Sequence, residues 1–197
     1  MLGFNYKKSV QALNFFAIKE GGSINKMKAL KLIWLSDRLH LRKYARPILN
    51  DTYFALNYGP VASNTKDLVE DTNFLSEEER AYRQQYLSSE EKYTYSSKHG
   101  FSGKVFSKTD IKVMGVIYEE YGKLDKFKLS EESHKYPEWK KFEGHLNSRN
   151  TSRFEMNYED FFSISNADKN TVFESNIESL ELTRDLFIEN GYIYRLI

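Results

Sequence analysis

The sequence predicts an α+β fold that is predominantly helical, with a helical core and a small antiparallel sheet. Three segments, at 5–20, 26–44 and 111–121, carry apolar residues at the spacing of an amphipathic helix. β-Branched and aromatic residues gather only in short runs bounded by turn-forming residues. A length of 197 residues suits one substantial core, or a core with an appended subdomain, better than two large domains.

Two long helices are predicted near the N-terminus. The first covers residues 5–20 and ends at Gly21-Gly22. The second follows a cap at Ser23 or Asn25 and covers residues 26–44. Its apolar arc is wide, which predicts a central and largely buried helix. It must end before Pro47, because the residue that precedes a proline avoids helical geometry.

A strand, a turn and two short helices are predicted next. Residues 52–56 are rich in β-formers, and Tyr58-Gly59-Pro60-Val61 predicts a rigid turn whose glycine takes a conformation closed to other residues. Ser63 or Asn64 is expected to cap a short helix that reaches Asp71. The polar segment 76–85, with acids first and arginines later, predicts a solvated helix.

The middle of the chain predicts a hairpin and then a strong helix. Residues 92–96 alternate in polarity and residues 103–106 form a second β-rich run, so we expect the two to pair. Ser107 and Asp110 have the spacing of a capping box, which opens the helix at 111–121.

The remaining elements are shorter or less regular. A helix over 126–134 is expected to be closed by Pro137, with the Trp139 ring docked on the core. Residues 145–153 predict an exposed loop, and about 171–189 a last helix.

The composition limits the classes of partner. Lys and Arg number 29 against 28 Asp and Glu, so the formal charge of +1 gives no overall attraction to nucleic acid or anionic lipid. The lack of cysteine excludes disulfides and thiolate chemistry and fits a reducing compartment, so we expect a cytoplasmic protein. No apolar run approaches the length of a membrane span, and the start does not resemble a signal peptide. Aromatics are 15% of residues, so some tyrosines are expected to face a partner.

Charge is segregated along the chain. Residues 23–48 hold seven basic residues and one acidic residue, whereas residues 155–189 hold nine acidic and two basic residues. The two segments either pair within the molecule or each await a partner.

The common catalytic and phosphate-binding motifs are missing, and no cofactor is expected. The best support for an enzyme or a metal-binding protein is Asp37 with His40, three residues apart on one face of the second predicted helix, with Tyr44 four residues further on. The histidines at 99, 134 and 145 are further metal ligands in principle. The alternative is that Asp37 and His40 satisfy each other beside a half-buried turn.

Arg42 and Arg46 stand four residues apart and suit bidentate binding of carboxylate or phosphate. They either hold an acidic partner or are fixed internally by Asp37, Asp51 or the acidic C-terminal segment. A DNA-binding helix is disfavoured, because the apolar arc interrupts the cations of the basic helix and no helix-turn-helix pattern accompanies it.

One stretch resembles a known family. Residues 24–63, INKMKALKLIWLSDRLHLRKYARPILNDTYFALNYGPVAS, are similar to the signature of the Panacea or SocA-like antitoxin domain family. A second block with Ser133-His134, Pro137 and Trp139 extends the resemblance to about residue 140. Ala45 stands where the family has a glycine, and Leu49-Asn50-Asp51 replaces a turn that usually contains one, so the local loop shape differs from the family's.

The resemblance implies a small, mostly helical cytoplasmic protein of a bacterium or prophage that neutralises a toxin encoded beside it. The founding member of the family instead delivers its toxin to a protease, so a cellular protease is the alternative partner. We therefore expect residues 1–140 to form the antitoxin domain and residues 141–197 a C-terminal helical extension packed on the same domain.

The same resemblance leads to a hypothesis about the charged part of the second helix. Asp37, His40, Arg42 and Arg46 would form, with Tyr53 and Tyr58, a polar lattice that locks this helix, the strand and the Tyr-Gly-Pro turn into a rigid platform. The signature residues counted as platform or partner-binding positions are Asp37, His40, Arg42, Arg46, Pro47, Tyr53, Tyr58, Gly59, Pro60, Ser63, His134 and Trp139. Toxin-specific contacts would lie around this platform, chiefly in 74–100 and the acidic C-terminal half.

Overall fold

The computed structural model describes residues 3–88, 91–148 and 152–193. It is mostly helical, and its six strands form two three-stranded antiparallel sheets within these residues, as the sequence predicts for the fold class. The helices are α1 (Tyr6–Lys19), α2 (Lys26–Tyr44), α3 (Ser63–Glu70), α4 (Glu77–Tyr86), α5 (Lys108–Tyr121), α6 (Lys126–Ser133), α7 (Pro137–Lys140), α8 (Glu143–Asn147) and α9 (Ile177–Ile193), with short 3-10 turns η1 (Gly103–Val105), η2 (Tyr158–Phe162) and η3 (Asn166–Asp168). The strands are β1 (Ser23–Asn25), β2 (Tyr53–Leu56), β3 (Gly59–Ala62), β4 (Leu87–Ser88), β5 (Thr94–Ser97) and β6 (Phe154–Glu155).

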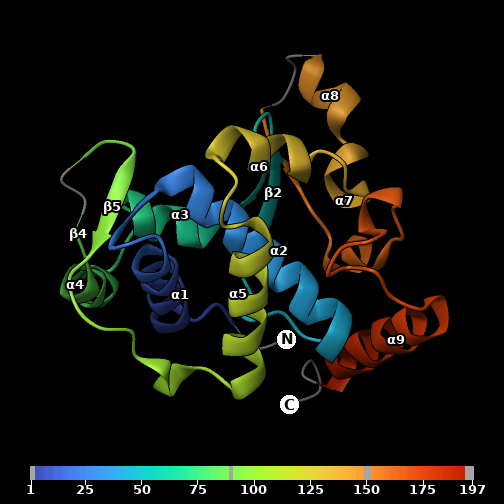
Figure 1. Cartoon of the computed structure of the whole chain (residues 1–197), viewed down its shortest axis with the longest axis horizontal. Coiled ribbons are helices and arrows are strands. Elements are labelled where there is room, and N and C mark those ends of the chain that lie inside the picture. The colour runs from blue at the N-terminus through green and yellow to red at the C-terminus, as the bar shows by residue number, and fades with distance from the viewer. Residues whose placement is uncertain (1–2, 89–90, 149–151, 194–197) are drawn as a thin grey trace.

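Helix α2 crosses the middle of the molecule and organises the rest (Figure 1). The side chain of Asn25 caps it by accepting from the backbone N–H groups of Met27 and Lys28. Every residue from Lys28 to Arg42 is buried, which confirms the central position predicted from the wide apolar arc. The helix ends at Ala45, which takes the left-handed conformation with φ of 55°.

The hairpin of β2 and β3 corrects the predicted turn. Tyr53 pairs with Ala62 and Leu56 with Gly59, so the connection is Asn57-Tyr58, and Gly59 and Pro60 lie in β3 rather than in the turn. Proline is tolerated there because β3 is the edge strand of the sheet β3-β2-β6.

The predicted pairing of 92–96 with 103–106 is wrong. β5 pairs instead with β1 on one side and with β4 on the other, while Gly103–Val105 forms the 3-10 turn η1. The rings of Phe101 and Phe106 stack on each other at 5.7 Å, and Phe101 also contacts Phe15 of α1. These aromatic residues therefore cover a helix rather than continue a strand.

The cap of α3 also differs from the prediction. Neither Ser63 nor Asn64 caps the helix, and its first residue is Ser63 itself. The carboxylate of Asp51 accepts from the backbone N–H groups of Asn64 at 2.9 Å and Thr65 at 2.8 Å. A residue from before the hairpin thus performs the capping function, which ties the loop ahead of β2 to α3.

The C-terminal part departs from the expected boundaries. Pro137 opens α7 as well as ending the preceding segment, and the last helix begins at Ile177 rather than near 171. Residues 145–147 belong to α8, and residues 149–151 of the expected loop lie outside the described residues. Helix α9 starts later than predicted because residues near 171 form a turn, in which the Thr171 hydroxyl donates to the carbonyl of Asp168. The side chain of Asn176 then accepts from the N–H of Glu178 at the start of the helix.

The core surrounds α2 on several sides. Trp34 and Tyr136 meet edge to face at 5.4 Å, and Phe161 and Phe173 of the C-terminal segment are fully buried. Helix α9 lies beside the C-terminal half of α2 (Figure 1). No helix among the described residues has the length and hydropathy of a membrane span.

Candidate functional site

Asp37 is the centre of the first of three polar clusters along α2. Its carboxylate accepts from the N–H of Ile48 at 2.8 Å, the N–H of Leu49 at 3.2 Å and the hydroxyl of Tyr53 at 3.0 Å. Burial raises the pKa of Asp37 to about 7, against the opposing effect of these three donors. One side chain thereby joins α2, the loop after it and β2.

The second cluster surrounds Asp110 on α5. The Nε2 atom of His40 lies 3.0 Å from Asp110 Oδ1, and the cations of Lys8 and Arg46 bind the same carboxylate at 2.9 Å and 2.7 Å. The Nδ1 atom of His40 bonds to the carbonyl of Arg46 at 2.8 Å. Burial alone would raise the pKa of Asp110, but hydrogen bonds from His40 and Lys8 outweigh it and hold that pKa well below its usual range.

Asp37 and His40 do not form the hydrogen-bonded pair that a catalytic or metal-binding role would require. The two side chains are 0% exposed, and they bind partners on different elements: Asp37 the loop and β2, His40 the Arg46 carbonyl and α5. Positions three apart on a helix can point to different neighbours when both flanks of the helix are covered. In the part of the chain that the structure describes, no three His, Cys, Asp or Glu residues are grouped to hold a metal.

Arg38 and Arg42 form the third cluster, with acids from later in the chain. Arg38 binds Glu138 at 2.8 Å and Asp168 at 3.0 Å, and its guanidinium carbon lies 4.2 Å and 4.6 Å from the ring centroids of Tyr136 and Phe173. Arg38 therefore combines two buried ion pairs with two cation–π contacts.

Arg42 donates to the carbonyls of Phe161 and Ser163 and pairs with Asp168 at 3.2 Å. The acidic C-terminal segment thus holds Arg42, as one of the three internal alternatives proposed, whereas Arg46 is held by Asp110, which was not among them.

Sequence reasoning missed Arg38, Asp110, Glu138 and Asp168. Each is buried, and their partners are separated by 64 or more residues, so no local spacing reveals them. The segregation of charge along the chain was the one available signal, and it marked Arg38 and Asp168 only as members of oppositely charged segments.

The β2–β3 hairpin forms a separate part of the site, packed on α6 and α7. Gly59 has φ of 95°, and a Cβ atom there would lie 2.1 Å from the Ser133 hydroxyl, so only glycine fits. The carbonyl of Pro60 accepts from the ammonium of Lys31, and that of Leu56 accepts from the indole of Trp139 at 2.8 Å.

The remaining signature residues take different positions. His134 stacks on Trp139 with ring centroids 3.8 Å apart, and the N–H of Ser63 donates to the carbonyl of Thr52. The carbonyl of Pro47 accepts from Arg46 at 3.4 Å. Tyr58 does not join the polar lattice: its side chain is exposed, and only its carbonyl is used, by the Ser130 hydroxyl at 2.9 Å.

Comparison with known proteins identifies a family for this chain. The family model described as "Antitoxin SocA-like, Panacea domain" matches residues 30–140, which is more than half of the chain and includes α2 from Leu30 onward, the hairpin, α6 and Trp139. Searches of curated proteins and of solved structures found no match. The match spans both blocks that carry the polar clusters and the hairpin, so the chain belongs to the SocA-like antitoxin family with a Panacea domain.

Proposed function

We propose that this protein neutralises a toxin encoded beside it by binding that toxin directly, without turning over a substrate, in the cytoplasm of a bacterium or of a prophage's host. Membership of an antitoxin family supports a cognate toxin as the partner class. The observation that carries the proposal is the internal use of Asp37, His40 and Arg42. All three are buried, and each bonds to another part of the same chain.

These polar clusters can favour binding because they hold the surrounding elements in one arrangement. A buried polar group left unpaired costs about 1–3 kcal/mol, so the hydrogen bonds of the Asp37 and Asp110 clusters favour one arrangement of α2, the hairpin and α5 over looser ones. A surface that is already ordered loses little conformational freedom when a partner binds. Rigid internal bracing of this kind therefore supports tight association.

The test is co-expression with the product of the adjoining open reading frame. We expect the chain to rescue growth of cells that express the toxin and to co-purify with it at a fixed ratio. Failure of both rescue and co-purification, with the two proteins present in soluble form, would contradict the proposal.

Delivery to a protease is the alternative that the same cells can distinguish. Direct neutralisation predicts equal rescue in strains that lack each cytoplasmic ATP-dependent protease, with toxin levels unchanged or increased by the complex. Rescue that requires one protease, together with faster loss of toxin, would instead assign the chain an adaptor role.

A further inference from the structure

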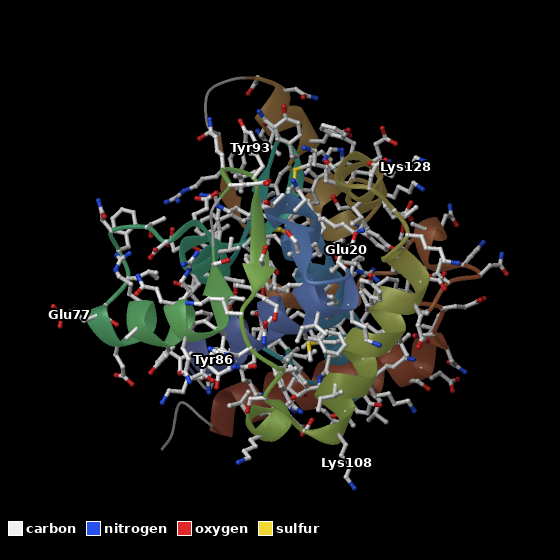
Figure 2. All side chains as sticks on the ribbon, turned by 60° about the vertical axis from the view of Figure 1, so that its left-hand side comes forward. Glu20, Glu77, Tyr86, Tyr93, Lys108 and Lys128 are labelled. Atoms are coloured by element: carbon white, nitrogen blue, oxygen red, sulfur yellow. The ribbon has the colours of Figure 1, made fainter. Side chains whose placement is uncertain are left out.

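A groove with a volume of about 860 Å³ lies at the N-terminal end of α2, beside the family's signature hairpin. Its floor is apolar, from Met27 and Leu30 of α2 and Leu56 and Val61 of the hairpin. Tyr93 and the start of α6 lie together at its rim, where the Lys126 ammonium is 5.9 Å from the centroid of the Tyr93 ring. Figure 2 shows Tyr93 at the same end of the molecule as Lys128 of α6.

Aromatic side chains stand exposed around this groove. Tyr58, Tyr93 and Phe127 are 65%, 62% and 58% exposed, and all three line it. They are three of the five large aromatic side chains that are exposed among the described residues. Aromatic residues with free surface at the edge of an apolar hollow are typical of the centre of a protein interface.

The lining is also rich in cations. It contains Lys and Arg at six positions, 26, 31, 66, 83, 92 and 126, against three acids, Glu70, Asp71 and Glu91. Glu70 pairs with the lining cation Lys66, and Asp71 pairs with the lining cation Arg83 and with Arg80, so the lining keeps three more cations than acids. In a protein whose formal charge is only +1, this is a local positive surface.

Lys31 adds a buried amine to the lining, and burial lowers its pKa to about 7. Its residue is 1% exposed, and its ammonium donates to the carbonyl of Pro60 at 2.7 Å. Among the described residues it forms no ion pair with a carboxylate, in contrast to the buried cations Arg38 and Arg42. A buried ammonium without an opposite charge is costly, and an incoming carboxylate would reduce that cost.

The groove is held open by bonds from several elements. The Ser130 hydroxyl and the Trp139 indole bind the carbonyls at either side of the hairpin turn, and the N–H of Lys26 donates to the carbonyl of Tyr93 at 2.9 Å. Its walls are thus fixed by the same hairpin, α6 and α7 that the family match covers.

We propose that this groove binds an acidic segment of the toxin that bears a large apolar side chain. Exposed aromatic residues and an excess of cations surround its apolar lining, and Lys31 within it forms no ion pair with a carboxylate among the described residues. This inference rests on the proposed function. The apolar floor would receive the toxin's apolar side chain, and the cationic rim its flanking carboxylates. A polynucleotide fits less well, because Glu70, Asp71 and Glu91 lie among the lining residues.

Charge reversal tests the proposal with a matched control. Lys126 and Lys108 are the first residues of α6 and α5, so a glutamate at either suits the helix N-terminus, but only Lys126 lines the groove. Lys108 lies at the opposite end of the molecule from Tyr93 (Figure 2). The groove variant is Lys92→Glu/Lys126→Glu, and the control is Lys108→Glu/Lys112→Glu, since Lys112 is also exposed.

Binding is measured by calorimetry with the purified product of the adjoining toxin gene. We expect the groove variant to weaken binding at least tenfold, and the control to change it less than twofold, with all melting temperatures within a few degrees of wild type. Tyr93→Ser is expected to weaken binding at least fivefold, whereas Phe74→Ser, at another exposed aromatic, is expected to leave it unchanged.

The contradicting outcomes separate this inference from the proposed function. If wild type and groove variant bind toxin equally, the toxin binds elsewhere, and direct neutralisation stands without the groove. If the wild type itself does not bind, both fail. The wild type is also tested for binding of a labelled single-stranded RNA and for self-association. If the groove variant loses either activity while it still binds toxin, the groove binds that other ligand instead.

Discussion

At the scale of single residues, several charged side chains on and around α2 are buried. Arg38 is fully enclosed, with Glu138 and Asp168 as ion partners and the rings of Tyr136 and Phe173 in contact with its guanidinium. Desolvating such a group is unfavourable, and the ion pairs and rings offset that cost. Its contribution is therefore best measured through its partners rather than by deletion alone.

Removing Arg38 alone should be strongly destabilising. Arg38→Met leaves Glu138 buried without its cation and leaves Asp168 with Arg42 alone, and we expect a loss of about 3–5 kcal/mol in the free energy of unfolding. The double variant Arg38→Met/Glu138→Gln should lose less than the sum of the two single losses, because the uncompensated charge is removed as well. Urea denaturation of the four proteins measures this coupling, and strictly additive losses would contradict it.

The Asp110 cluster predicts a pH dependence. The folded-state pKa of Asp110 lies below the value of about 4 of an unfolded chain, so its stabilisation is present above that pH and is lost as the pH falls towards the folded pKa. We expect Asp110→Asn to cost about 1–3 kcal/mol near neutral pH. In urea titrations, the gap between wild type and variant should shrink from pH 5 to pH 3; a gap independent of pH would argue against an ionised Asp110.

At the scale of elements, the hairpin depends on close backbone approach. Gly59 combines a positive φ with packing against Ser133 and Lys31. Gly59→Ala should therefore lower the free energy of unfolding by about 1–3 kcal/mol through backbone strain, and further through the clash of the new Cβ atom with Ser133. The control is Gly115→Ala on α5, where a Cβ meets nothing within 4 Å and an alanine favours the helix. Equal melting temperatures for the two variants would contradict the tight hairpin.

The elements also show which parts of the structure the sequence determines locally. α1, α2 and α5 were predicted because long periodic apolar faces and capping residues are local signals. β1, β4 and β6 have two or three residues each and exist only through their pairing partners, so no pattern marks them.

The same division holds for the site. The contact of Asp37 with Tyr53 was expected only from the family resemblance, whereas the binding of His40 to Asp110 joins residues 70 positions apart and depends on how α5 packs on α2. The Asp51 cap of α3 was missed for a related reason, because it acts 13 residues from its first target.

At the scale of the whole molecule, the C-terminal segment takes part in the central core. Asp168 binds Arg38 and Arg42, and Phe161 contacts the ring of Tyr53 at 5.6 Å. The oppositely charged segments thus pair in part within the molecule, while Glu178, Glu181 and Asp185 of α9 remain exposed. We propose that residues 141–197 are an integral extension of the antitoxin domain.

Truncation tests that proposal. A chain that ends at Lys140 would leave Arg38 and Arg42 without Asp168 and would expose the faces covered by Phe161 and Phe173. We expect it to lose cooperative thermal unfolding, as measured by circular dichroism. A truncated chain that unfolds cooperatively near the wild-type temperature would show that residues 1–140 fold independently.

Stoichiometric binding by a rigid, already ordered surface can be tested by titration with purified components. Toxin activity is measured at a fixed toxin concentration well above the dissociation constant while the chain is added, with no protease or other protein present. We expect a linear loss of activity that is complete near an equimolar ratio and does not progress with time. Activity that persists at excess chain, or that disappears over time at a small fraction of equimolar chain, would contradict it.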